Sequence, residues 1–477
     1  MRLLLATIIL LPIFCFSQRQ GNIWYFGDKA GVDFNSGNPI GLTNGVSTDS
    51  SYTDGEGTTA ISDSSGNLLF YSNGQRLINK NHLLMPNGDG LLGNYSSTQS
   101  SLIIPLPGSS EIFFAFTVDD VNIDSYKYGF RYSVVDICLD NGLGDVVSGQ
   151  KNVLLLDTVT EKVAAVRHSN GIDYWVVTHK LFTDQFYSYK LTSAGIVDTV
   201  ITHIGSVHGH GQGQLKFSPD GNKIAVAANQ HWLAPYYFEL FNFDNSTGVL
   251  SNLISLTTPT NSAIYGVEFS PDNSKLFGVY SGFSPMGTGI VQYDLSSGNQ
   301  TAINSSMLKV YQQSNVATLR GLQLGPDNKI YQVGIYDRDY LMAINSPNSY
   351  GLSCNVQDSA VYLGGRLGIG GLPTFIAGYS YSNKTFNCPT NITTNKYCRQ
   401  VTVFPNPCSD FLKINSSDQS STLELKLFDF RGLVVYSTFF KHNDIISIDK
   451  LNSGLYFYQV ADRSTKNVIV TGKVVKE

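Results

Sequence analysis

The sequence predicts an all-β protein, and three observations indicate this fold class. Only 14% of the 477 residues are charged, whereas the chain has 45 glycines, 27 tyrosines and 27 phenylalanines, a composition typical of short strands joined by tight turns. No stretch shows the sustained i, i+3, i+4, i+7 apolar spacing of an amphipathic helix. In addition, one strand–turn–strand pattern recurs along the middle of the chain.

The N-terminal residues have the features of a secretory signal peptide. Arg2 supplies a short basic segment, and residues 3–16 are almost entirely apolar. A run of this length is typical of a signal-peptide core and is too short to span a bilayer. We therefore expect cleavage after Ser17, which removes residues 1–17. Acylation of Cys15 is the less favoured alternative, because a bulky residue precedes it.

Three segments in the middle of the chain share a strand, a Pro-Asp turn and a second strand. The turn prolines are Pro219, Pro271 and Pro326, so successive turns are 52 and 55 residues apart. Proline fits the first central position of a tight turn, and the following Asp can accept hydrogen bonds from the nearby backbone. A period of this length is typical of one four-stranded blade of a β-propeller.

Looser copies of the pattern flank these three turns. They begin at Thr59, Ser101 and Ala164, which gives six inner hairpins. A seventh inner strand is expected at residues 371–377, with its partners at residues 22–34. Pairing the two ends in one sheet would close a ring and remove exposed sheet edges. We expect about seven blades, with six or eight left open.

The recurring Ser-Pro-Asp-Gly turn resembles that of secreted propellers of the YVTN and WD40-like kind. The resemblance covers three turns closely and the others loosely. The Gly-His and Trp-Asp elements of true WD40 blades do not recur along the chain. The resemblance implies a β-propeller in which this turn recurs once per blade, but a fold of this kind does not fix a function.

The end of the chain carries a second set of spaced motifs. A Phe-Pro-Asn-Pro motif is followed by short strands that end at the last residue. In this combination residues 401–477 resemble the C-terminal sorting domain, type A-like, of the bacterial type IX secretion system. The residues that carry this resemblance are Pro405, Asn406, Pro407, Asp429, Gly432, Gly454 and Tyr456.

The sorting resemblance implies a destination and a set of partners. Alternating apolar residues at 423–428 predict a small immunoglobulin-like β-sandwich. The resemblance implies recognition by the type IX secretion machinery and its sortase, followed by cleavage and attachment to the cell surface or release. We therefore expect a signal peptide at 1–17, a propeller at 18–380, a linker at 381–400 and a sorting domain at 401–477.

The charge balance argues against nucleic-acid partners. Residues 18–399 contain 22 Lys plus Arg and 29 Asp plus Glu, which gives a net charge of −7. A negative surface without a basic stripe repels phosphate backbones. We therefore expect no nucleic-acid binding.

Five cysteines remain after removal of the signal peptide, so at least one is unpaired unless a pair forms between molecules. Cys354 and Cys388 bracket the closing blade, and Cys398 and Cys408 bracket the start of the tail. We expect these two pairs to form disulfides, which leaves Cys138 as a buried thiol. The chain has no Cys-x-x-Cys pair of the kind that binds zinc.

Histidine is distributed unevenly, with six of eight residues between His168 and His231. His208 and His210 would face the same side of an extended segment, as two metal ligands could. With His231 and Trp232 they mark the first place to look for a ligand. The competing interpretation is a glycine-rich loop with solvated histidines, because two imidazoles without a third ligand make a poor metal site.

A partial calcium motif lies at Asp120, Asn122 and Asp124. The match fails at Ser125, where the loop needs glycine, and at Arg131, where a bidentate Glu is required. An acidic surface loop is therefore favoured over a calcium site. We expect no other cofactor.

Enzyme motifs are absent from the sequence. It has no G-x-S-x-G elbow, no H-E-x-x-H and no P-loop. We expect a non-enzymatic propeller that binds protein or carbohydrate at the cell surface. The alternative is a polysaccharide hydrolase or lyase at the channel mouth. Two or three converging carboxylates roughly 5 to 10 Å apart would favour the enzyme, whereas a mouth lined by Gly, Ser and aromatic residues would favour binding.

Overall fold

The chain divides into two compact units, Met1–Cys388 and Pro389–Glu477. The expected signal peptide lies outside the residues that the structure describes. This computed structural model describes residues 19–46, 56–120, 127–228, 237–259, 262–282, 287–313, 319–334, 338–381, 386, 388, 401–416, 422–429, 433–441, 443–463 and 468–477.

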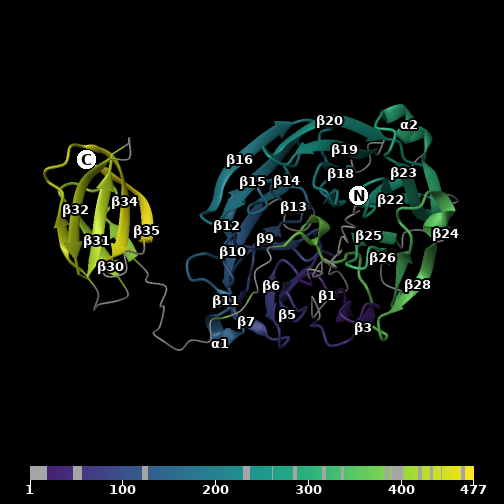
Figure 1. Ribbon diagram of the computed structural model, residues 1–477, viewed down its shortest axis with the longest axis horizontal. Coiled ribbons are helices and arrows are strands. Elements are labelled where there is room, and N and C mark those ends of the chain that lie inside the picture. Colours follow the sequence, from purple (N-terminus) through teal and green to yellow (C-terminus); the bar gives the residue numbers. More distant parts are fainter. Residues whose placement is uncertain are drawn as a thin grey trace, which may run out of the picture. The chain divides into compact units, whose positions relative to one another are not determined.

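The described residues of the first unit form seven antiparallel sheets, each built from strands that are consecutive in the chain. In Figure 1 the sheets follow one another around a common centre, so the arrangement is propeller-like. The first three sheets contain β1 (Ile23–Phe26), β2 (Ala30–Asp33) and β3 (Ile40–Leu42); β4 (Thr59–Ser62), β5 (Leu68–Ser72), β6 (Arg76–Asn79) and β7 (Leu84–Asp89); and β8 (Ser101–Pro105), β9 (Ile112–Val118), β10 (Phe130–Asp136), β11 (Asp145–Val146) and β12 (Val153–Leu156).

The next four sheets have four strands each. They contain β13 (Ala164–Arg167), β14 (Tyr174–His179), β15 (Gln185–Thr192) and β16 (Gly195–His203); β17 (Leu215–Phe217), β18 (Lys223–Ala228), β19 (Tyr237–Asp244) and β20 (Val249–Leu256); β21 (Ser262–Phe269), β22 (Lys275–Gly282), β23 (Thr288–Asp294) and β24 (Leu308–Gln313); and β25 (Leu319–Leu324), β26 (Ile330–Gly334), β27 (Tyr340–Ile344) and β28 (Val356–Tyr362). Helical segments are short: α1 (Leu139–Gly142), α2 (Gln300–Ser305), η1 (Gly351–Cys354) and η2 (Ala377–Tyr379).

The predicted strand–turn–strand repeat is confirmed, and a serine–aspartate pair organises its turns. Between β17 and β18, the Ser218 hydroxyl donates to Asp220 Oδ1 at 2.5 Å and accepts from the Lys223 backbone N–H at 2.9 Å. Ser270 and Asp272 make the same contact at 2.7 Å between β21 and β22. These local bonds satisfy the backbone of the turn, so the motif can recur wherever two inner strands must be joined.

Aromatic side chains fill the spaces between adjacent sheets. Trp24 of the first sheet is fully buried and lies 5.7 Å, between ring centroids, from Tyr331 of the seventh sheet. Trp175 of the fourth sheet lies 6.5 Å from Phe243 of the fifth. Large rings suit these positions because the gap between twisted sheets widens away from the centre.

Residues 371–377 do not form the shared closing sheet that the sequence predicted. Strands β1 to β3 form a three-stranded sheet of their own. The later residues instead make single bridges at Asp28–Leu367, Thr58–Pro373 and Ala165–Ile376. Because these partners belong to the first, second and fourth sheets, residues 367–381 run across the centre of the unit. We call this stretch the crossing segment.

The expected disulfide pairing is wrong. Cys138 bonds to Cys388 with their Cα atoms 5.3 Å apart, whereas Cys354 and Cys408 are buried free thiols. Cys398 lies outside the described residues. The crossing segment explains the pairing, because it carries the chain from the seventh sheet back to the third, where Cys138 follows β10.

The region beyond the crossing segment also packs into the first unit. Tyr381 is fully buried, and Phe386 packs on Phe113 with ring centroids 5.0 Å apart. The first compact unit extends to Cys388. The first residues of the range expected as a linker, 381–400, therefore belong to the folded part.

The second unit consists of two sheets around one core. One sheet pairs β29 (Val401–Phe404), β30 (Phe411–Ser416) and β33 (Ile445–Ser447), and the other pairs β32 (Val434–Phe440), β31 (Leu423–Phe428), β34 (Gly454–Asp462) and β35 (Val468–Lys476). Alternate residues of the strands face the shared core, which includes Leu412, Ile414, Leu423, Leu425, Leu427 and Val460. No helix in the described ranges is long and apolar enough to cross a membrane.

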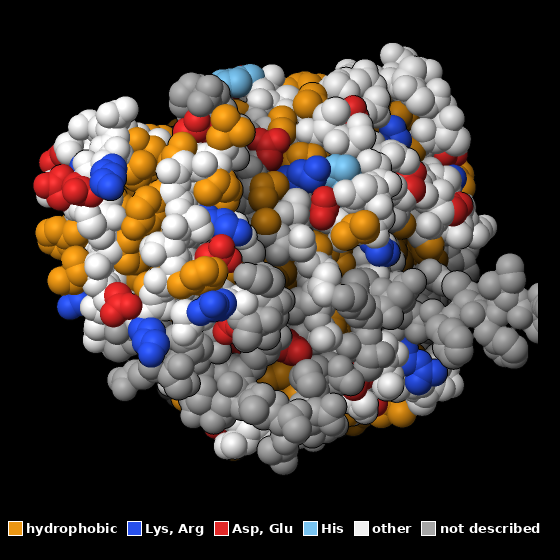
Figure 2. Space-filling view, turned by 60° about the vertical axis from the view of Figure 1, so that its left-hand side comes forward, with side chains coloured by type: hydrophobic (Ala, Val, Ile, Leu, Met, Phe, Trp, Pro, Cys, Tyr) orange, Lys and Arg blue, Asp and Glu red, His pale blue; other side chains and the backbone are white. Residues whose placement is uncertain are grey.

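Charged side chains are interspersed on the surface. On the face shown in Figure 2, Lys and Arg side chains lie singly among acidic, apolar and uncharged groups. The described side chains on that face therefore form no continuous basic stripe of the kind that follows a nucleic-acid backbone.

The disulfide should contribute measurably to the stability of the first unit. We expect Cys388→Ala to lower the free energy of unfolding by about 2–5 kcal/mol, because the bond closes a long loop between residues separated by 250 positions. Denaturant unfolding under oxidising conditions measures this change. Cys354→Ala is the matched control, since that thiol is buried but unpaired. Equal destabilisation by a reductant in the wild type and in Cys388→Ala would contradict the assignment.

Candidate functional site

The centre of the first unit is lined by polar side chains that join the inner strands of different sheets. Gln99 donates to the carbonyls of Val163 and Leu215 at 2.9 and 3.2 Å. The Gln214 carbonyl oxygen accepts from the backbone N–H groups of Val267 and Leu322 at 3.2 and 3.0 Å. An inner strand is the edge of its sheet, so its outward backbone groups need such partners. A glutamine amide supplies both a donor and an acceptor.

The crossing segment supplies hydrogen-bond partners to further backbone groups at the centre. The Thr374 N–H donates to the Thr58 carbonyl at 2.8 Å, and the Gly321 N–H donates to the Gly370 carbonyl at 3.0 Å. The Tyr379 hydroxyl donates to the Leu324 carbonyl. A space beside the segment measures about 30 Å³, which suits one water, whereas ligand pockets are roughly 300–1,000 Å³.

A buried acid and a buried base lie directly before β13. Glu161 and Lys162 are both 0% exposed. Glu161 Oε2 accepts from the backbone N–H and the hydroxyl of Thr98 at 3.1 and 3.0 Å. The Lys162 ammonium donates to the carbonyls of Gly211 and Gln212, the latter at 2.6 Å. The pair therefore ties the start of the fourth sheet to the loops that lead into the third and fifth.

Burial changes the protonation chemistry of this pair. It raises the pKa of Glu161 to about 8, with the nearby carboxylates of Asp120 and Glu56 adding to the effect. It lowers the pKa of Lys162 to about 7, against the attraction of Glu161 and Glu239. Both shifts favour the uncharged forms, because a charge is poorly solvated in this environment.

Three carboxyl groups thus act on one another at this end of the centre. Asp120 is 1% exposed, and Glu56 accepts a hydrogen bond from the Tyr265 hydroxyl at 2.5 Å. The Arg320 guanidinium lies 4.8 Å from the centroid of the Tyr265 ring. Burial, followed by the charge of Glu56, raises the pKa of the Tyr265 hydroxyl well above its usual value.

His208, one of the predicted ligand residues, lies in a buried packing cluster. His208 is 0% exposed and stacks on His179 with ring centroids 3.7 Å apart. Its Nε2 lies 3.2 Å from Glu239 Oε2. Burial lowers the pKa of both imidazoles well below the usual value, so both are neutral near pH 7. Among the described residues, His208 and His210 join no group of converging metal ligands.

Other predicted ligands have different outcomes. His210 is 8% exposed and lies in the same loop as His208, between β16 and β17. His231 and Trp232 lie outside the described residues. His179 was missed by the sequence reasoning. The one sequence feature that could have indicated it is its position as the last residue of β14 in the fourth sheet.

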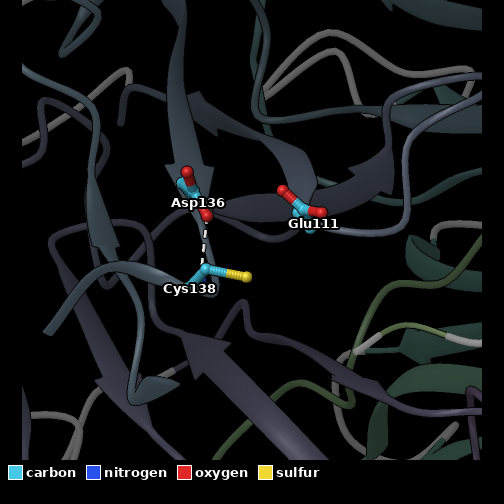
Figure 3. Close-up of side chains that lie close together, drawn as sticks. All are labelled: Glu111, Asp136 and Cys138. Atoms are coloured by element: carbon cyan, nitrogen blue, oxygen red, sulfur yellow. Dashed lines mark hydrogen bonds between the residues drawn. The ribbon is translucent and has the colours of Figure 1, made fainter. Parts of the chain in front are cut away.

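Within the described ranges, one group of potential metal ligands comes together away from this centre (Figure 3). It consists of Glu111, Asp136 and Cys138, whose ligand atoms lie within 4.8 Å of one another. The Cys138 sulfur is bonded to Cys388, so it cannot act as a thiolate ligand. Asp136 Oδ1 accepts the Cys138 backbone N–H at 2.8 Å, which gives that carboxylate a structural partner.

The calcium prediction is not tested by these residues. Asp120 is a buried member of the carboxyl cluster. Asn122 and Asp124 lie outside the described residues. Calcium binding at this loop therefore stays a prediction.

The sorting-motif residues stabilise turns and edges of the second unit. Asn406 donates to the Lys473 carbonyl at 3.0 Å and accepts from the Val475 N–H at 2.9 Å, which fastens the first motif to β35. Pro405 and Pro407 flank it. A turn after β31 closes through Asp429, whose Oδ1 accepts the Leu433 N–H at 3.0 Å.

The second half of the motif set precedes and begins β34. Gly454 is the first residue of that strand. The Tyr456 hydroxyl donates to the Asn452 carbonyl at 2.8 Å, which closes the turn before the strand. Gly432 lies outside the described residues. The described motif residues are therefore mainly turn-formers.

The buried acid should make stability pH-dependent. The folded-state pKa of Glu161 is raised, so its contribution to stability is complete below about pH 4.5 and is lost as the pH rises through about 8. The depressed pKa of Lys162 has the opposite effect, because its contribution is lost as the pH falls through about 7.

We expect Glu161→Gln to remove the loss of stability at high pH and to raise the melting temperature above pH 8. Thermal melts across pH measure this, with Glu111→Gln as a control; parallel profiles for Glu161→Gln and the wild type would contradict it.

Comparison with known proteins identifies the family of the tail but assigns no family to the first unit. Residues 402–477 match the family model described as the secretion system C-terminal sorting domain. No curated protein matches the chain.

Solved structures share a distant likeness. Hydrazine synthase of Kuenenia stuttgartiensis is 11% identical, with 79% of this chain and 94% of that chain covered and a TM-score of 0.41. The periplasmic gluconolactonase PpgL of Pseudomonas aeruginosa is 12% identical, with coverage of 74% and 94% and a TM-score of 0.33. An ancestral GH74 enzyme is 12% identical, with coverage of 96% and 63% and a TM-score of 0.37. At these values the likeness carries no information about activity.

The tail establishes where the protein goes. A C-terminal sorting domain engages the type IX secretion machinery, which exports its cargo across the outer membrane. The protein is therefore a secreted cargo of the type IX secretion system, and it reaches the cell surface or the extracellular space.

Proposed function

We propose that this secreted cargo carries a seven-bladed β-propeller that binds a protein or a carbohydrate without transforming it. Each of the seven sheets corresponds to one blade. The packing of Trp24 on Tyr331, between the first and seventh sheets, supports a closed ring. In this proposal residues 1–17 are a signal peptide, and the sortase of the secretion system processes the tail.

The main support for a non-enzymatic function is the burial of the reactive groups at the centre. Glu161, Lys162 and His208 are all 0% exposed. A general acid or base must come within hydrogen-bond reach of its substrate. The crossing segment makes hydrogen bonds and bridges to the inner strands at the centre. These groups therefore serve to hold the sheets together, and ligand binding belongs on the outer surface.

One observation favours the alternative, a polysaccharide hydrolase or lyase. Glycosidases pair a protonated carboxylic acid with an ionised one, and their environments move the two pKa values apart. The raised pKa of Glu161 beside Asp120 and Glu56 meets the first part of this requirement. Access of a substrate to Glu161 is the part that the described residues do not supply.

An activity assay separates the two proposals. We expect the full-length secreted protein to release no reducing sugar from plant, fungal or bacterial polysaccharides, because Glu161 has no solvent exposure. Reducing-end detection after long incubation measures this. Sugar release by the wild type that Glu161→Gln abolishes would establish the enzyme in place of the binding protein.

Export beyond the periplasm should depend on the second unit. Deletion of residues 401–477 should leave a folded first unit in the periplasm, because the sorting domain is a separate compact unit with its own core. Cell fractionation with immunodetection measures the distribution. Cys354→Ala, which alters neither the tail nor the disulfide, should be exported normally. Normal export of the truncated protein would refute the role of the tail.

A further inference from the structure

A pair of exposed tyrosines lies on the seventh sheet, away from the buried centre. Tyr340 begins β27 and Tyr362 ends β28, and the two are directly opposite in the strand register. They are 37% and 52% exposed. Their ring centroids are 4.9 Å apart with an interplanar angle of 37°. We call this pair the tyrosine platform.

The platform has unused polar groups of its own. Among the described residues, neither phenol hydroxyl makes a hydrogen bond, so both can donate to and accept from a ligand. Gly364 and Gly365 form the turn after Tyr362, with φ values of +66° and +77° that favour glycine. A Cβ at Gly365 would lie 3.8 Å from the Tyr362 hydroxyl oxygen, an ordinary van der Waals contact.

A polar network is built from residues of the same hairpin and of the neighbouring sixth sheet. Arg338, two residues before Tyr340, contacts Asp358 Oδ1 at 2.5 Å and donates to Gln313 Oε1 at 2.7 Å. The Tyr311 hydroxyl, on β24 of the sixth sheet, donates to the same Asp358 oxygen at 2.8 Å. The Asp358 side chain is 51% exposed, and its second oxygen has no hydrogen-bond partner in the described part of the chain.

We infer that the tyrosine platform and this network form a binding site for a neutral pyranose oligosaccharide. This inference rests on the proposed binding function and names its ligand class. A pyranose ring presents an apolar C–H face that can lie on a phenol ring, and hydroxyl groups at its edge that suit Asp358 and the phenols. The guanidinium of Arg338 and the carboxylate of Asp358 neutralise each other, which favours an uncharged ligand over an acidic glycan or a phosphate.

The size and composition of the surface favour a glycan over a protein. A standard protein interface buries about 800 Å² on each partner around an apolar core. Two half-exposed phenol rings beside charged groups supply much less apolar area. For a sugar, one or two stacked rings with a few convergent polar groups are sufficient.

A glycan array probed with the full-length secreted protein tests the inference. The array carries neutral hexose and pentose oligosaccharides, and titration calorimetry then measures the affinity for the best binder. We expect Tyr340→Ala and Tyr362→Ala each to weaken binding by about tenfold or more, since each removes a stacking ring. Tyr340→Phe should retain most of the affinity. Tyr350→Ala is the matched control, because Tyr350 is 47% exposed but lies outside the platform.

The outcomes separate this inference from the function on which it rests. Unchanged affinity in a Tyr340→Ala/Tyr362→Ala double variant with a wild-type melting temperature would overturn the platform and leave a binding function intact. Failure of the wild type to bind any neutral oligosaccharide would also overturn it. Sugar release from a bound oligosaccharide would instead overturn the non-enzymatic function while leaving the platform in place.

Discussion

The first unit depends on how the inner strands satisfy their backbone at the centre. Each inner strand is the edge of its own sheet, so one row of N–H and C=O groups lacks a strand partner. Gln99 and Gln214 supply side-chain amides to these groups, and the crossing segment supplies backbone. Both solutions place polar atoms among buried residues. The buried polar centre is therefore a consequence of the architecture.

The same constraint explains why a cluster with perturbed protonation need not be an active site. A carboxyl group or an amine placed among inner strands is desolvated whether or not it performs chemistry, so its pKa shifts toward the neutral form. Glu161 is bonded to Thr98, and Lys162 to the loop before β17. Burial in a structural bridge between sheets is sufficient to shift their pKa values. Exposed groups on the outer strands keep their solvent contacts and are better placed to meet a ligand.

The signal for export lies in the second unit, separate from the first unit. The second unit has its own core, and its motif residues close turns and edges within that unit. The last described residues of the first unit are held by burial of Tyr381 and by the Cys138–Cys388 bond. Because the disulfide lies before the boundary between the units, cleavage after Cys388 would leave the crossing segment covalently attached to the third sheet. Removal of the sorting domain is thus compatible with an intact first unit.

The sequence by itself determined what local interactions encode. The Ser218–Asp220 turn and its repeats follow from hydrogen bonds between residues at most five positions apart. The sorting domain can be identified from sequence because its turn residues keep a fixed spacing. Only the tertiary structure decided which distant segments meet. Alternation could place His208 and His210 on one side of a strand, but whether that side faces water depends on His179 and Glu239 from other strands. Likewise, Cys388 reaches Cys138 because the crossing segment spans the centre, and no local pattern records that path.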